Sequence, residues 1–136
     1  MAKIVLAGED LEWMDSVRAT IESMGHEVFF VESALDVVDE VLEQEAALAV
    51  LDESMATFDG YEVAQMLRDE PNVPDVFSVL LLVSEGAVSG RLERAGVSEC
   101  FVKGHNSAEL SDLLVKMLGD EAGVGLEDEA ADFLKG

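Results

Sequence analysis

Short apolar runs alternate with segments of helical periodicity along most of this 136-residue chain. The apolar runs predict strands at residues 4–7, 27–31, 48–51, 79–83 and 100–102. The segments between and after them predict helices at residues 11–23, after Ser33, at about 61–69, near 90–95 and after Ser107. Strands that alternate with helices favour right-handed βαβ units. We therefore expect a single α/β domain, doubly wound, with five parallel strands and helices on both faces of the sheet.

Apolar stripes within the helical segments indicate which faces meet the sheet. The first stripe consists of Met14, Val17 and Ile21. The second consists of Leu35, Val38 and Leu42, and the last of Leu110, Leu113, Leu114 and Met117. We expect Gly25 to end the first helix and Gly60 to serve a turn. We expect Trp13 to be partly packed; the alternative is that it lines the rim of a site at the strand ends.

The last 18 residues, 119–136, fall outside this pattern. They are rich in Gly and acidic residues. A short helix there could use Leu126, Ala130, Phe133 and Leu134. We therefore divide the chain into a domain at residues 1–118 and an acidic C-terminal tail at residues 119–136.

The charge of the chain is strongly negative, with 30 Asp and Glu against 8 Lys and Arg, for a net charge of −22. Such a chain repels nucleic acid and anionic lipid, so we expect neither as a partner. The charges are spread through periodic segments, which argues against a disordered acidic protein. They favour a folded protein adapted to high salt; an ordinary acidic protein is the alternative.

The sequence shows no sign of a membrane span or a signal peptide. No run of eighteen apolar residues occurs, and the N-terminal apolar stretch is short and ends in acid. A cytoplasmic location is the expectation. Cys100 is the sole cysteine, which excludes an internal disulfide and a cysteine-based zinc site. We expect His26 and His105 to be solvated loop residues rather than metal ligands.

Polar residues follow the predicted strands at the edge where an open α/β sheet binds ligands. They are Glu9, Asp10, Asp52, Ser84 and Lys103. An acid at a strand end means little in so acidic a chain. Lysines number only 4 of 136 residues, so Lys103 at the end of the fifth strand is more informative, although a solvated loop charge is the ordinary alternative.

Three motifs in order carry a family resemblance that covers residues 3 to about 118. They are LDESMATFDG, with Asp52, Met55, Asp59 and Gly60 in step, VLLLVS ending at Ser84, and RAGVSECFVKG, with Ala95, Gly96 and Lys103 in step. The chain resembles the receiver domains of two-component response regulators, of the chemotaxis-regulator type. The resemblance implies a flavodoxin-like sheet with strand order 2-1-3-4-5.

The resemblance also implies a chemistry for the site. Asp52 would accept a phosphoryl group as an acyl phosphate, with Lys103 paired to a phosphoryl oxygen and Ser84 hydrogen-bonded to another. Phosphoryl transfer depends on charge neutralisation, which Mg²⁺ would supply. Its ligands would be Glu9, Asp10, Asp52 and the backbone carbonyl of Ser54. Asp59 is the rival acid but belongs to the turn beside Gly60.

The sequence departs from the family at the metal site. The usual acidic pair falls on Gly8 and Glu9, so the first acid is missing. Glu9 takes the direct metal position, and Asp10 either substitutes for the missing acid or caps the helix. We therefore expect weak Mg²⁺ binding.

Further departures affect the loops and the relay to partners. Ala56 and Gly104 replace prolines that the family usually has, which loosens both loops. Cys100 occupies the family's aromatic switch position. Strand alternation should point the neighbouring Phe101 to the opposite face.

We expect a stand-alone phospho-accepting signalling domain and not an enzyme. A histidine kinase or phosphotransfer protein would supply the phosphoryl group, and an unidentified protein would receive the signal. The alternative is a pseudo-receiver, an interaction module without metal-dependent phosphorylation. A flavodoxin-like cofactor binder and a haloacid-dehalogenase-type phosphatase fit less well. The loop after the first strand is acidic, and Ser54 stands where that phosphatase needs an acid.

Overall fold

The computed structural model describes residues 2–9, 11–55, 58–74, 76–84, 94–102 and 107–118. Its strands are β1 (Lys3–Ala7), β2 (Glu27–Val31), β3 (Leu48–Asp52), β4 (Ser78–Val83) and β5 (Glu99–Val102). Its helices are α1 (Leu11–Ser23), α2 (Val37–Gln44), α3 (Gly60–Asp69) and α5 (Ser107–Leu118). Of the helix expected at 90–95, residues 94 and 95 are described, and both are helical. The tail at 119–136 lies outside the described residues.

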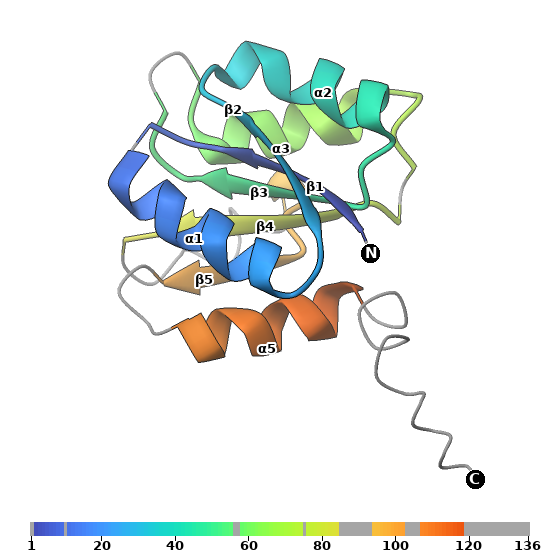
Figure 1. The fold of residues 1–136 in the computed structure, drawn as a ribbon. Helices are drawn as coiled ribbons and strands as arrows, with labels where there is room; N and C mark the ends of the chain where they lie inside the picture. Colours follow the sequence, from blue (N-terminus) through green and yellow to red (C-terminus); the bar gives the residue numbers. More distant parts are fainter. Residues whose placement is uncertain are drawn as a thin grey trace, which may run out of the picture.

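The five strands form one parallel sheet in the order β2-β1-β3-β4-β5 (Figure 1). This confirms the predicted fold class and strand order. All residues of β3, and all of β4 except the first, are buried. The two strands are apolar almost throughout because both faces of a central parallel strand are covered.

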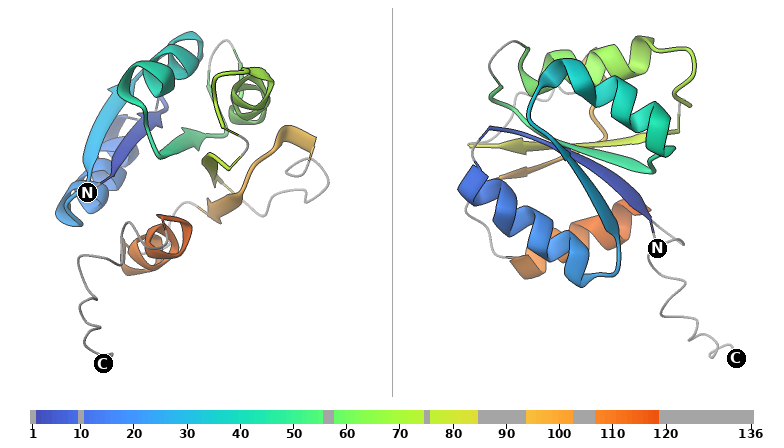
Figure 2. Two further views of the ribbon diagram at one scale, coloured as in Figure 1. Left: turned by 90° about the vertical axis from the view of Figure 1, so that its right-hand side faces the viewer. Right: turned by 45° about the horizontal axis from the view of Figure 1, so that its top comes forward.

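The helices form two layers, one on each face of the sheet (Figure 2). Helices α1 and α5 lie together on one face, and α2 and α3 lie on the other. Alternate residues of each strand point to opposite layers, so the core is divided in two. In β1, for example, Ile4 and Leu6 pack with α1 and α5, whereas Val5 and Ala7 pack with α2 and α3.

Two of the predicted helical stripes are confirmed. Met14, Val17 and Ile21 are buried on α1, and Gly25 follows that helix with a φ of +90°, a left-handed conformation that favours glycine. On α5, Leu110 and Leu114 are buried, and Leu113 and Met117 pack against the same core. None of the helices in the described ranges is long and apolar enough to cross a membrane.

The stripe predicted after Ser33 was partly wrong. The Ser33 hydroxyl accepts a hydrogen bond from the backbone N–H of Leu35, which begins a 3₁₀ turn at Ala34–Asp36 instead of α2 itself. The tighter turn directs Leu35 away from the core, so that it is 56% exposed. The other two members of the stripe, Val38 and Leu42, pack against the core as predicted, beside the fully buried Val37 and Val41.

Helix α3 begins with a reciprocal capping box, shortly after the end of β3. The Asp59 carboxylate accepts the N–H of Glu62 at 2.9 Å, and the Glu62 carboxylate accepts the N–H of Asp59 at 2.9 Å. Gly60 is the first residue of this helix, so the turn predicted for it was wrong. A Cβ on Gly60 would lie 2.5 Å from the carbonyl oxygen of Asp52, so glycine lets α3 approach the end of β3.

His26 corrects another expectation. It is only 6% exposed, and its Nδ1 accepts a hydrogen bond from the backbone N–H of Ala2 at 3.0 Å. The predicted solvated histidine is therefore a buried residue that fixes the start of β1 beside β2. His105 lies outside the described residues.

Candidate functional site

The register of the sheet places Asp52 at its carboxyl edge. Asp52 is the last residue of β3 and lies opposite Leu82 of β4, whereas Ala7, the last residue of β1, lies opposite Leu51. Gly8 therefore reaches the level of Asp52, and Glu9 follows it. In open parallel sheets, ligands usually bind at the carboxyl ends of the strands, at the point where the strand order reverses.

The Asp52 side chain is buried, with 1% of the residue exposed. Its Oδ1 accepts a hydrogen bond from the backbone N–H of Ser54 at 3.0 Å. This bond places the backbone of Ser54 beside the carboxylate. A buried carboxylate needs polar or cationic neighbours, and that requirement makes this position chemically distinct from the many exposed acids.

Ser84 follows β4 at the same edge and is exposed. Its backbone N–H donates to Oε1 of Glu53 at 2.6 Å. The backbone N–H of Glu53 in turn donates to the carbonyl of Leu82 at 2.9 Å. Glu53 therefore links the ends of β3 and β4 through both its main chain and its side chain.

Of the predicted metal ligands, the structure describes Glu9, Asp52 and Ser54. Glu9 is exposed and borders an open hollow of about 330 Å³ with Leu11 and Glu32. Asp10 and Lys103 lie outside the described residues. Among the described residues no group of three or more His, Cys, Asp or Glu is arranged to hold a metal ion.

Gly8 is buried against Met14 and Asp52. A Cβ at position 8 would lie 2.6 Å from Sδ of Met14 and 3.1 Å from Cβ of Asp52. Met14 is 1% exposed, so its thioether fills the space into which a side chain at position 8 would extend. An uncharged group thus occupies the place beside Asp52 where the resemblance expects a carboxylate.

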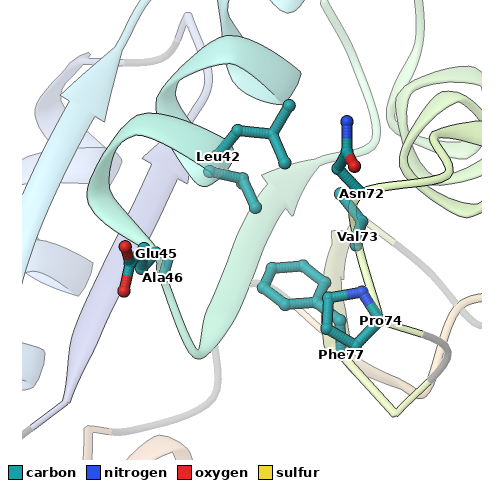
Figure 3. Close-up of a pocket in the computed structure, with 8 residues that line it drawn as sticks. Leu42, Glu45, Ala46, Asn72, Val73, Pro74 and Phe77 are labelled. Carbon is teal, nitrogen blue, oxygen red and sulfur yellow. The ribbon is translucent and has the colours of Figure 1, made fainter.

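A separate apolar hollow of about 230 Å³ lies at the opposite edge of the sheet (Figure 3). It is lined by Val41, Leu42, Glu45, Ala46, Asn72, Val73, Pro74 and Phe77. Ala46 and Phe77 precede β3 and β4, whereas Asp52 ends β3. This hollow is therefore distinct from the polar edge.

The sequence pattern of the response regulator receiver domain matches residues 4–115. The chain belongs to the response regulator receiver family. One curated relative is the sensory transduction protein BceR of Halalkalibacterium halodurans, which is 27% identical over 77 residues. That match covers 57% of this receiver domain's chain and 33% of the relative, so the chain corresponds to about a third of that longer protein.

Solved structures show the same fold. Chemotaxis protein CheY4 of Vibrio cholerae superposes with a TM-score of 0.80 at 18% identity, covering 86% of this chain and 98% of that one. The receiver domain of the sensor histidine kinase PA1611 from Pseudomonas aeruginosa PAO1 gives a TM-score of 0.77 at 21% identity, covering 87% and 98%. The latter structure has a magnesium ion coordinated in its active-site cleft.

Cys100 and Phe101 point to opposite faces of the sheet, as strand alternation predicts. Phe101 is buried in the layer of α1 and α5, whereas Cys100 packs against the other layer. Trp13 is partly buried and shares a small hollow with Phe101 and Leu110, so it packs between α1 and α5. Burial, and to a lesser degree the carboxylate of Glu99, raise the pKa of the Cys100 thiol above its ordinary value.

Sequence reasoning missed two residues of the site. Glu53 carries a hydrogen bond to a residue 31 positions away, and no local pattern indicates such a partner. Met14 was assigned to the core correctly, but its contact with the space beside Gly8 was not foreseen. The absence of a side chain at Gly8 was the one available signal that a neighbour fills this space.

Proposed function

We propose that this receiver domain accepts a phosphoryl group on Asp52. The single observation that carries the proposal is the burial of Asp52 at the carboxyl edge of β3, beside the end of β1 and the backbone of Ser54. Asp59, the rival acid, is engaged in the capping box of α3 and stabilises that helix. Family membership supports the same assignment.

The reaction is a transfer between two nucleophiles. A carboxylate oxygen of Asp52 attacks the phosphorus atom, and a new O–P bond forms. The bond between phosphorus and the donor atom breaks, and its electron pair leaves with the donor. The donor atom is a histidine nitrogen in a kinase or phosphotransfer protein, or an oxygen in a small acyl phosphate. The product is an acyl phosphate on this chain, so the role is that of a signalling domain and not of an enzyme.

The donor set of the site fits Mg²⁺ in chemical type. Mg²⁺ binds oxygen ligands, keeps several waters and commonly takes only one or two carboxylates from the protein. Asp52, Glu9 and the carbonyl of Ser54 would supply such ligands, and Asp10 is a further candidate. The ion would neutralise negative charge during transfer. The loss of an acid at Gly8 makes weak binding the expectation.

Ser84 and Lys103 complete the proposed site. The Ser84 hydroxyl stands at the exposed end of β4, two residues beyond the partner of Asp52, where it would donate to a phosphoryl oxygen. The ammonium of Lys103 would pair with another oxygen; this role rests on the family pattern and on its place just after β5.

Partners and location follow from the same proposal. A histidine kinase or phosphotransfer protein would donate the phosphoryl group, and output would pass through contact with another protein. The net charge of −22 supports the exclusion of nucleic acid and anionic membranes as partners. We propose a cytoplasmic location, where such kinases present their phosphorylated histidines.

Intact-mass spectrometry after incubation with acetyl phosphate, with Mg²⁺ or with EDTA, tests the function. Wild type should gain one phosphoryl group with Mg²⁺ and none with EDTA. Asp52→Asn, which is nearly isosteric, should gain none, whereas Asp59→Asn should be labelled like wild type. Labelling of Asp52→Asn, or no labelling of wild type where a known receiver is labelled, would reject the proposal.

A pseudo-receiver is the second candidate, and the contact between Gly8 and Met14 favours it. An uncharged thioether beside Asp52 removes one anionic attraction for a divalent cation. In that case the same fold serves protein recognition alone. The outcome that separates the two functions is whether wild type is labelled in the presence of Mg²⁺.

A further inference from the structure

Glu53 places a negative charge at the site that the acceptor function does not require. Its side chain is half-buried, and Oε1 accepts the backbone N–H of Ser84 at 2.6 Å. Hydrogen bonds from an N–H to a carboxylate are short and about twice as strong as those between neutral groups. The end of β4 is therefore tied to the end of β3 by a charged group.

The register places the Glu53–Ser84 bond at the same edge of the sheet as the acceptor. Asp52 is opposite Leu82, and Ser84 is two residues further toward the carboxyl edge. A phosphoryl group on Asp52 would therefore be added at the edge of the sheet where the backbone N–H of Ser84 already binds the carboxylate of Glu53.

We propose that Glu53 is an inhibitory positioning residue that restrains the unmodified site. Its carboxylate engages the Ser84 N–H as a resident anion and holds Ser84 in place. An incoming phosphoryl group meets both the repulsion of this charge and the tether on Ser84. This inference rests on the proposed acceptor function of Asp52.

Two substitutions separate the charge from the hydrogen bond. Glu53→Gln keeps an oxygen that accepts the Ser84 N–H but removes the negative charge. Glu53→Ala removes both. Glu43→Gln is the matched control, because Glu43 is an exposed residue of α2 and reports the loss of one charge far from the site.

The initial rate of labelling by acetyl phosphate is measured by intact mass at fixed Mg²⁺ and KCl. We expect Glu53→Gln to be labelled roughly 3- to 10-fold faster than wild type, and Glu53→Ala at least as fast. Glu43→Gln should stay within about twofold of wild type. A Glu53→Gln rate equal to or below that of wild type, or matched by Glu43→Gln, would overturn the proposal.

An amide NMR spectrum without any phosphoryl donor tests the hydrogen bond itself. The Ser84 amide resonance should shift strongly in Glu53→Ala and less in Glu53→Gln. An unchanged Ser84 resonance in Glu53→Ala would also overturn the proposal. If wild type and all variants fail to be labelled where a known receiver is labelled, the acceptor function is rejected and the inhibitory role with it. If wild type is labelled and Glu53→Gln is no faster, the inhibitory role alone is rejected.

Discussion

The substitution Gly8→Asp restores the missing carboxylate and should make stability depend on Mg²⁺. A Cβ at position 8 would lie 2.6 Å from Sδ of Met14, so the thioether has to move. Overpacking of this kind typically costs about 1–3 kcal/mol. The new carboxylate also lies beside buried Asp52, and two such charges about 5 Å apart repel by about 3 kcal/mol at an effective dielectric of 20. Water at the open edge reduces this repulsion, so we expect the free energy of unfolding to fall by about 2–5 kcal/mol in the absence of a divalent cation.

Gly8→Asn is the matched control, because it carries nearly the same shape without the charge. Thermal unfolding is followed at constant KCl, with EDTA or with 10 mM Mg²⁺, where each kcal/mol corresponds to roughly 3–5 °C. In EDTA, Gly8→Asp should melt below Gly8→Asn, and Gly8→Asn below wild type. Mg²⁺ should raise the melting temperature of Gly8→Asp more than that of either other protein. Equal Mg²⁺ responses in the three proteins would refute the assignment of this edge as the metal site.

Three further predictions concern charge, the thiol and the α3 cap. The melting temperature should rise on the order of 10 °C between 0.1 and 2 M KCl, because salt screens a net charge of −22; no rise would remove the case for salt adaptation. The raised pKa of Cys100 leaves less thiolate at pH 8 than in a free cysteine, so a disulfide reagent should react slowly until urea unfolds the chain. Equal reaction rates of the Cys100 thiol with and without urea would contradict its raised pKa in the folded protein. Asp59→Ala should lower the free energy of unfolding, measured in urea, by about 1 kcal/mol, and Asp59→Asn should lower it much less. Phosphoryl labelling of Asp52 should continue in both variants, and its loss would give Asp59 a role in the site.

Periodicity predicted the fold because buried strands and amphipathic helices leave local patterns. The strand after residue 78 and the stripe of Met14, Val17 and Ile21 were readable in this way. Leu35 was misplaced because Ser33 caps a 3₁₀ turn before α2 begins, and a single serine does not distinguish the two outcomes. The burial of His26 depends on the backbone of Ala2, which is 24 residues away.

The site was predictable to the extent that strand ends determine it. The place of Asp52 after a fully apolar strand located it at the carboxyl edge, but its assignment as the acceptor came from the resemblance of the motif LDESMATFDG to the family, because acids are common at strand ends in this chain. The bond between Glu53 and Ser84 was not predictable, because it depends on the register of β3 with β4. Gly60 was taken for a turn residue, since its role is a close approach between backbones that only three-dimensional packing reveals.

The identity of the modified residue tests the central claim most directly. Borohydride reduces an acyl phosphate of aspartate to homoserine, so the modified position can be read by peptide mass mapping. After incubation with acetyl phosphate and Mg²⁺, followed by borohydride, homoserine should be found at position 52 and at no other acid. EDTA should abolish it. Homoserine at Asp59 or at another carboxylate, or none under conditions that convert a known receiver, would contradict the account.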